Sequence, residues 1–258
     1  MKIAVCVKAV PDTESKVAVG ADKQNIDVAG IKFITSPYDE FAVEEAIRLK
    51  EKNGGETVAI ALGGDEATDV LRDTLARGIE TAVHLKDPLF ANADPLTTAK
   101  ALAAAIKDGG YDLVLCGHQS SGGDNSQVPS ILAELLGWPQ ANVVVKLEIN
   151  DKLFKAEREI EGAHEFIEGS LPAVISAQKG LNEPRYPSIK GVMAARRKEI
   201  AVKDAAALGI ADQVAKRKVR VRELSIPPDR PSGKRIEGDA QTQAKTLVEL
   251  LRSEARVI

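Results

Sequence analysis

The first 138 residues alternate apolar runs with amphipathic segments, and this alternation restricts the possible folds more than any other feature of the chain. Four such pairs follow one another, each a run typical of a strand and then a stretch with helical spacing. Strands that alternate with helices predict a parallel sheet with helices on both faces. The runs are residues 2–9, 57–62, 81–85 and 112–116, and the helical stretches are 38–53, 65–76, 95–107 and a last one ending near 136.

The pattern changes after residue 142, where strand-like segments follow one another without helices between them. These are residues 143–149, 153–160, 165–168 and 173–177, and we expect them to form hairpins. Prolines and glycines break residues 179–193, which predicts a long loop, either ordered or mobile. The fold class is therefore α/β, a doubly wound, mostly parallel, Rossmann-like sheet with added antiparallel strands. We expect this domain to span residues 1–226, followed by an extended C-terminal arm of linker and helix over 227–258.

Positive charge is concentrated in one part of a nearly neutral chain. Residues 178–222 carry a net charge of +8, whereas the remainder carries −11, and this separation predicts a docking surface for an acidic partner. Aromatic residues make up only 3% of the chain, which disfavours a base-stacking surface, so we expect no nucleic-acid partner. The two cysteines and three histidines show no metal-ligand spacing, and we expect no metal site.

Localisation follows from the cysteine usage and from the start of the chain. Unpaired cysteines fit a reducing compartment. The apolar run at residues 2–9 is too short to cross a bilayer, and no cleavage site follows it. We therefore expect a cytoplasmic protein without direct membrane insertion.

A loop rich in glycine, hydroxyl and amide residues follows the fourth strand. Ligands of an open parallel sheet bind beyond the carboxyl ends of the strands, where this loop, GHQSSGGDNSQ (117–127), precedes a helix. The free N–H groups of a helix start favour an anion, so the loop could hold a phosphate. The chain lacks a GxxxxGK[ST] motif and a GxSxG motif, so we expect binding without hydrolysis. The alternative is that the glycines merely permit a tight turn, and we interpret Cys6 and Cys116 as core residues.

Four stretches of the sequence carry a resemblance to a known family. They are KIAVCVKAVPDT (2–13), SPYDEFAVEEAIRLKE (36–51), the loop and helix ending in LLGWPQ (135–140), and LPAVISAQKGLNEPRYPSIKGVMAARRKEI (171–200). The chain resembles the beta subunits of electron-transferring flavoproteins over its whole length. The resemblance implies an electron carrier, not a catalyst by itself, paired with an alpha subunit that holds FAD and contacts the C-terminal helix.

The resemblance further implies partners and ligands. Electrons would come from acyl-CoA dehydrogenases of fatty acid beta-oxidation or related flavoprotein dehydrogenases and would pass to a membrane-associated quinone oxidoreductase. A structural AMP would contact Cys6, Ser36, Pro37, Tyr38, Asp39, Leu62, Gly117, His118, Gln119, Ser120, Ser121, Gly122, Gly123, Asp124, Asn125, Ser126, Gln127 and Val128. Partner recognition would use Glu183, Pro184, Arg185, Tyr186, Ile189, Met193, Arg196 and Arg197, with Ile189 as the apolar anchor.

Some residues depart from the AMP-binding pattern. Relatives in the AMP branch usually carry Asn in place of Ser36 and acidic residues in place of Gly122 and Gly123. Residues 10–13 and the loop's GD-x-x-QV resemble instead the electron-bifurcating branch, whose beta subunits hold a second FAD and an NADH site. Because SPYDEFAVEEA matches the AMP branch, we favour AMP. Another alternative, a nucleotide-binding signalling or stress module of the same fold, leaves the basic segment and terminal helix without a purpose.

Overall fold

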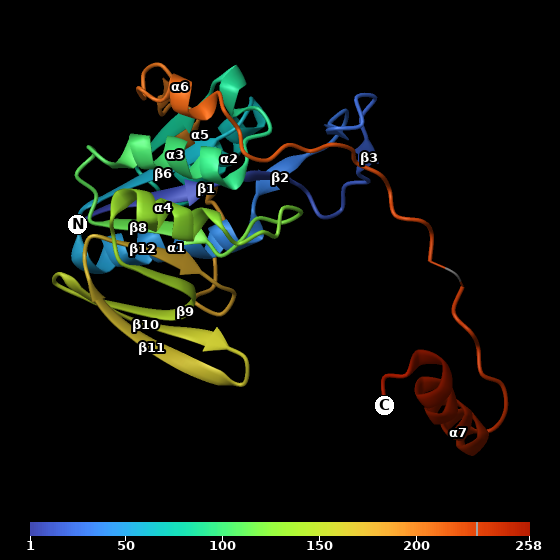
Figure 1. The fold of residues 1–258 in the computed structure, drawn as a ribbon. Coiled ribbons are helices and arrows are strands. Elements are labelled where there is room, and N and C mark those ends of the chain that lie inside the picture. Colours follow the sequence, from blue (N-terminus) through green and yellow to red (C-terminus); the bar gives the residue numbers. More distant parts are fainter. Residues whose placement is uncertain (231) are drawn as a thin grey trace. The chain divides into compact units, whose positions relative to one another are not determined.

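A nine-stranded mixed sheet forms the centre of the computed structural model, which describes residues 1–230 and 232–258 (Figure 1). The strand order is β11-β10-β9-β12-β8-β1-β6-β7-β13. In this order, every pair of neighbours from β9 through β12, β8, β1, β6 and β7 to β13 is parallel. The β9–β10 and β10–β11 pairs are antiparallel. The strands are β1 (Lys2–Val7), β6 (Glu56–Leu62), β7 (Thr81–Leu85), β8 (Leu113–Gly117), β9 (Gln140–Asn150), β10 (Leu153–Ile160), β11 (Ala163–Ser170), β12 (Ala173–Ala177) and β13 (Ile200–Lys203).

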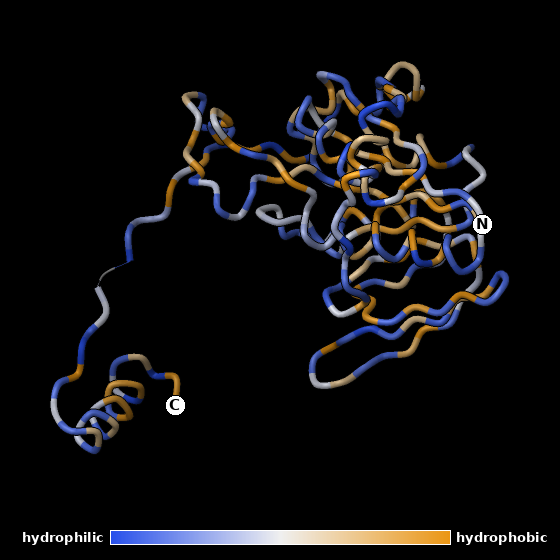
Figure 2. The backbone as a smooth tube through the Cα atoms, turned by 180° about the vertical axis from the view of Figure 1, so that it is seen from behind, coloured by the Kyte–Doolittle hydropathy of each residue, from blue (hydrophilic) through white to orange (hydrophobic). Residues whose placement is uncertain are grey.

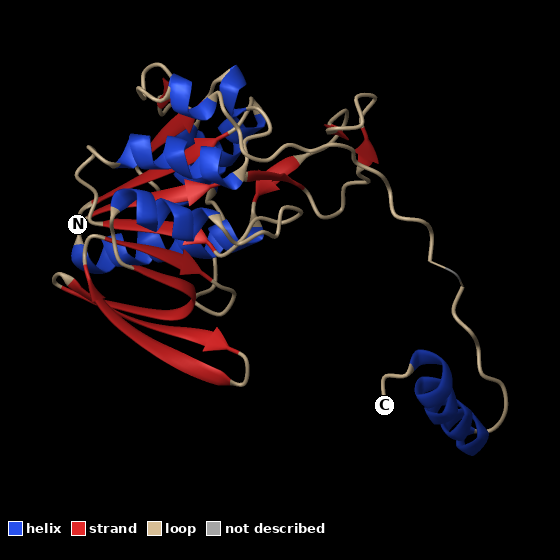
Figure 3. Ribbon diagram, in the orientation of Figure 1, coloured by secondary structure: helices blue, strands red, loops and turns tan. Residues whose placement is uncertain are grey.

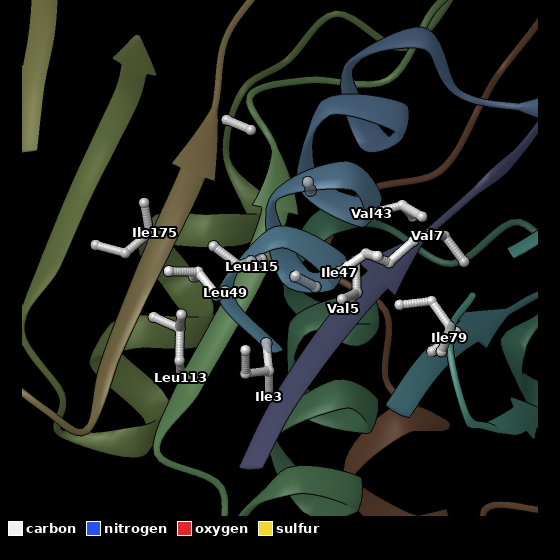
Figure 4. Close-up of a cluster of buried hydrophobic side chains, with 14 of the residues drawn as sticks. Ile3, Val5, Val7, Val43, Ile47, Leu49, Ile79, Leu113, Leu115 and Ile175 are labelled. Atoms are coloured by element: carbon white, nitrogen blue, oxygen red, sulfur yellow. The ribbon is translucent and has the colours of Figure 1, made fainter. Parts of the chain in front are cut away.

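Helices cover both faces of the sheet, which confirms the predicted doubly wound α/β class. α1 (Pro37–Asn53) and α2 (Glu66–Arg77) pack on one face, and α3 (Pro95–Ile106) and α4 (Val128–Leu136) pack on the other. β1 shows why the strand sequences are apolar on both faces. Ile3 and Val5 contribute to the core on the side of α1 and α2 (Figure 4), whereas Cys6 contributes to the core on the side of α3 and α4. Figure 2 shows apolar residues running along these central strands.

The start of α1 differs in one detail from what its sequence indicates. Ser36 occupies the N-cap position and Pro37 follows, a sequence typical of a helix start, but the Ser36 hydroxyl makes no capping bond. It is fully buried and has no hydrogen-bond partner among the described residues. Acidic residues in the first turn and Lys50 and Lys52 in the last turn complement the helix dipole, and Gly54 ends the helix with φ of 70°.

The expectation of consecutive hairpins over residues 143–177 is wrong for its last segment. β9–β10 and β10–β11 are hairpins, but β12 returns to the sheet and lies parallel to both β9 and β8. The physical reason is burial: every residue of β12 is buried, as in a strand covered on both faces. The predicted loop at 179–193 also contains the start of a helix, α5 (Ile189–Ala195), which Ser188 caps.

Smaller elements complete the domain. The irregular stretch after β1 forms two small antiparallel pairs (Figure 3). These are β2 (Ala9–Pro11) with β5 (Phe33–Thr35) and β3 (Ala18–Val19) with β4 (Ile26–Asp27). Sequence reasoning did not predict β13, α6 (Ala211–Val214) or the 3-10 turn η1 (Pro88–Phe90).

The chain divides into two compact units, Met1–Glu223 and Leu224–Ile258. The second unit contains α7 (Ala240–Leu250), which continues as the π-helical turn η2 (Leu251–Ala255). The Asp239 side chain caps α7 by accepting the Thr242 N–H at 2.7 Å. None of the α7 residues is buried. No helix of the described residues has the length and apolar character needed to cross a membrane.

Candidate functional site

A cavity of about 550 Å³ lies at the carboxyl ends of β1, β6 and β8, where ligands bind in open parallel sheets. Its volume falls within the usual range for small-molecule sites. Strand β1 contributes Cys6, β6 contributes Leu62, and β8 contributes Cys116 and Gly117. The cavity lies at the strand ends where the sequence predicts that a ligand binds.

Many of the residues predicted to bind a nucleotide line this cavity. They are Cys6, Asp39, Leu62, Gly117, His118, Gln119, Ser120, Asn125, Ser126, Gln127 and Val128. The other predicted residues are outside its lining: Ser36, Pro37, Tyr38, Ser121, Gly122, Gly123 and Asp124. Tyr38 still supports the wall indirectly, because its ring meets that of His118 edge-on, with centroids 6.0 Å apart.

Several lining residues were missed by sequence reasoning. Lys8 follows β1, Gly63 and Glu66 follow β6, and the turn around Phe90 to Thr98 follows β7. Their position in the sequence could have identified them. Each segment directly follows a parallel strand, and the carboxyl ends of all these strands lie on the same side of the sheet. Phe90 and Leu102 also give the cavity an apolar wall that the sequence argument did not anticipate.

Lys8 brings a cation to the glycine-rich loop. Its Nζ donates a hydrogen bond to Ser120 Oγ at 3.0 Å. Burial lowers the pKa of Lys8, while the charges of Asp39 and Asp124 oppose that shift. The loop has no lysine of its own, so a residue from a neighbouring strand end supplies its positive charge.

Asp39 links the segments that form the floor of the cavity. One carboxylate oxygen accepts the Lys8 N–H at 2.8 Å, and the other accepts the Gly117 N–H at 3.0 Å. Burial raises the pKa of Asp39 to about 7, although these two bonds and the Lys8 charge favour the ionised form. The first turn of α1 is thereby joined to the ends of β1 and β8.

The glycine-rich loop has a preformed, strained conformation. Asp124 and Ser126 adopt positive φ values of 44° and 50°, which non-glycine residues rarely do. Side chains hold this conformation: Gln119 Nε2 donates to Asp124 Oδ1 at 3.1 Å, and Ser126 Oγ donates to Gln119 Oε1 at 2.9 Å. The loop is therefore shaped before any ligand arrives.

The residues around the loop fit a nucleotide. α4 begins at Val128 without a side-chain cap, so its first N–H groups remain available to an anion, and Lys8 adds a full positive charge. A Cβ atom at Gly123 would lie 2.7 Å from Ser120 Oγ, so a larger residue there would require the Ser120 side chain to move. Cationic and N–H donors on one side and the apolar wall on the other match a phosphate and a base.

Cys6 and Cys116 are register partners on the adjacent strands β1 and β8. Both are free and buried, and both line the cavity floor. Contact with the Cys6 thiol and burial raise the pKa of Cys116, so this thiol is a poor nucleophile. These positions agree with the interpretation of both cysteines as core residues.

The residues predicted to recognise a partner divide into two groups. Tyr186, Ile189 and Met193 are 90%, 84% and 59% exposed. Glu183, Arg196 and Arg197 are also exposed, and Pro184 is half-buried. Arg185, in contrast, binds two carboxylates of helix α1 within the same chain.

Known proteins resemble this chain over its whole length. The family model described as electron transfer flavoprotein domain matches residues 25–208. The electron transfer flavoprotein subunit beta of Bacillus subtilis is 42% identical over 260 residues, which cover all of both chains. The subunit of the same name from Syntrophomonas wolfei is 42% identical over 258 residues, covering 100% of this chain and 98% of its own. That of Mus musculus is 35% identical over 249 residues, covering 95% and 96%.

Proposed function

Because this chain belongs to the electron transfer flavoprotein family, among its beta subunits, we propose that it pairs with an alpha subunit and holds AMP as a structural ligand. The family places the chain in electron transport. The observation that carries the AMP proposal is the cavity, where Lys8, the strained loop and the start of α4 surround one space. A nucleotide phosphate satisfies these donors, and the adenine fits against Phe90 and Leu102.

The chemistry of the pair resides in its flavin. FAD, held mainly by the alpha subunit, would supply the electron transfer when bound. This chain contributes binding and shape: Asp39 fastens the strand ends and Lys8 neutralises the phosphate. Its C-terminal arm, which contains the exposed helix α7, is proposed to pack on the alpha subunit.

The donor of electrons is proposed to be an acyl-CoA dehydrogenase or a related flavoprotein dehydrogenase, and the acceptor a membrane-associated quinone oxidoreductase. The exposed Ile189 and Met193 lie beside basic residues, an arrangement in which an apolar anchor enters a partner pocket within a ring of charges. Replacing Ile189 with Ala should slow electron transfer from the dehydrogenase without loss of flavin. An unchanged rate of electron transfer would show that Ile189 is not part of the recognition surface.

One mass measurement tests the ligand assignment. The chain is co-expressed with its alpha subunit, the heterodimer is denatured, and the released nucleotides are identified and counted. AMP and one FAD per heterodimer support the proposal. Two FAD and no AMP would favour the electron-bifurcating alternative, which residues 10–13 and the loop sequence keep open. A colourless chain that binds no alpha subunit would favour a nucleotide-binding signalling module.

A further inference from the structure

Residues 182–185 are fastened to one face of helix α1. Asn182 Nδ2 donates to the Phe41 carbonyl at 3.0 Å and to Glu45 Oε2 at 2.9 Å. Arg185 then binds two carboxylates, because its guanidinium donates to both oxygens of Glu44 at 2.9 and 3.0 Å and to both oxygens of Glu51 at 2.7 and 3.0 Å. Residues three, four and seven positions apart share a helix face, so these contacts form one continuous row.

The backbone at Arg185 is held by a second arginine, from helix α2. Arg77 Nη1 donates to the Arg185 carbonyl at 3.1 Å. The same guanidinium is fixed by Asp73 at 2.7 Å and by Glu40 at 2.6 Å, and its side chain is only 12% exposed. The carbonyl and the side chain of Arg185 are therefore held from two different helices.

Helix α5, immediately downstream, is fixed against helix α2. Arg72 donates to the carbonyls of Ala195 and Lys198, where α5 ends. Gly191 approaches the Ala76 carbonyl so closely that a Cβ atom there would overlap it. With both ends of residues 185–198 anchored, Tyr186 and Ile189 are left on the outer surface, fully presented to solvent.

The ion pair between Arg185 and Glu44 is the least replaceable contact of this set. The Glu44 side chain is only 4% exposed, compared with 57% for Glu51. Burial disfavours the Glu44 carboxylate, but the hydrogen bonds from Arg185 outweigh burial and lower its pKa. Without the Arg185 side chain, this buried carboxylate would keep only its bond to Arg48 and the bond from the backbone N–H of residue 185.

We propose that Arg185 is a positioning residue for partner recognition: its paired contacts with Glu44 and Glu51 hold residues 186–198 in the arrangement that presents Ile189 and Met193. This inference rests on the proposed function, because it assumes that a redox partner binds this surface. A surface ordered before binding loses less conformational entropy on docking, so Arg185 would act on the partner's KM without touching the partner.

Hydrogen exchange and steady-state kinetics of the whole heterodimer test this role. In Arg185→Ala, we expect amide exchange over residues 186–198 to accelerate about tenfold, since local opening becomes easier there. KM for the dehydrogenase should rise about fivefold, because docking would then have to order one or two additional side chains. We expect kcat to stay nearly unchanged. Arg185→Lys should restore only part of both effects, because an ammonium cannot bind two carboxylates bidentately.

Arg197→Ala is the matched control. Arg197 is an exposed arginine of the same segment that takes no part in the contacts with α1, so its removal should leave exchange at 186–198 unchanged. Exchange over residues 3–7 of β1 reports whether each variant keeps its fold. If Arg185→Ala destroys the fold, Glu51→Gln, which disturbs only the exposed carboxylate, replaces it in the comparison.

The outcomes separate this inference from the proposed function. Unchanged exchange in Arg185→Ala overturns the positioning role, even if KM rises. Faster exchange with an unchanged KM also overturns it, because the ordered segment would then be irrelevant to the partner. If Ile189→Ala is silent as well, the proposed recognition surface itself fails.

Discussion

Asp39 Oδ1 accepts a hydrogen bond from the backbone N–H of Gly117 at 3.0 Å, across 78 residues of sequence. This contact joins the first turn of α1 to the last residue of β8, at the mouth of the candidate nucleotide cavity. Gly117 leaves no room for a side chain, because a Cβ atom there would overlap Asp39 Oδ1 and lie 2.7 Å from the Asp39 backbone nitrogen. The shape of the cavity floor thus depends on the absence of a side chain at Gly117.

Replacing Gly117 with Ala should therefore damage both stability and ligand binding. Overpacking at a rigid site costs about 1–3 kcal/mol, and the displaced Asp39 would also release the Lys8 N–H. Urea unfolding measures the first effect, and nucleotide content after purification measures the second. Gly233→Ala serves as the control, since its Cβ atom would meet open space. Wild-type behaviour of Gly117→Ala would show that the floor can relax.

Lys8 should contribute directly to nucleotide affinity. Lys8→Met keeps most of the side-chain volume but removes the charge beside Ser120, and a charge-assisted hydrogen bond is worth about 1.5–3 kcal/mol. We expect AMP to bind the nucleotide-depleted heterodimer tenfold or more weakly, as measured by calorimetry, and with reduced dependence on salt. Lys107→Met, an exposed lysine just after α3, should leave the affinity unchanged. Equal affinities in both variants would mean that the backbone N–H groups of α4 suffice.

Asp94 should make the protein sensitive to acid. Burial opposes its ionisation, but bonds from the N–H groups of Thr97, Lys218 and Val219 outweigh burial and lower its pKa to about 2. Because this pKa lies below the ordinary value of an aspartate, the carboxylate stabilises the fold above about pH 4, and this contribution disappears as the pH falls toward 2. The contribution is about 2 kcal/mol.

The variant Asp94→Asn tests this pH dependence. An amide presents one acceptor oxygen where the carboxylate has two, so the bond from the Thr97 N–H to Oδ1 and the bonds from the Lys218 and Val219 N–H groups to Oδ2 cannot all survive. Unfolding free energies measured from pH 5 to pH 2 should decline less steeply in the variant than in the wild type, with the difference greatest at pH 5. Parallel curves would assign the acid sensitivity to other carboxylates.

The parallel half of the fold could be predicted because its strands are buried on both faces. Residues 3–7 and 113–116 are apolar without interruption, and turn residues separate them from the helices. β13 gave no such signal, since its four residues lie at the edge of the sheet and three of them are exposed. The placement of β12 could not be predicted either, because the apolar sequence of a buried strand does not determine which strands it pairs with.

The part of the candidate site that lies in a single loop could be predicted from the sequence. The glycine-rich loop and Asp39 were identified from spacing and resemblance, whereas Lys8 and Phe90 were missed. Lys8 looks like an ordinary surface lysine in the sequence, and only the pairing of β1 with β8 brings its amine to Ser120. The double ion pair of Arg185 was equally invisible, because Glu44 and Glu51 lie more than 130 residues earlier in the chain.

The insertion of β12 between β9 and β8 has a consequence for synthesis in the cell. Until residues 173–177 are made, β8 can pair with β1 but lacks the neighbour for its other edge. An open edge of this kind can pair with the strands of other nascent chains. The middle of the sheet closes only with Ala173–Ala177, so an incomplete chain that ends before β12 exposes an unpaired central strand.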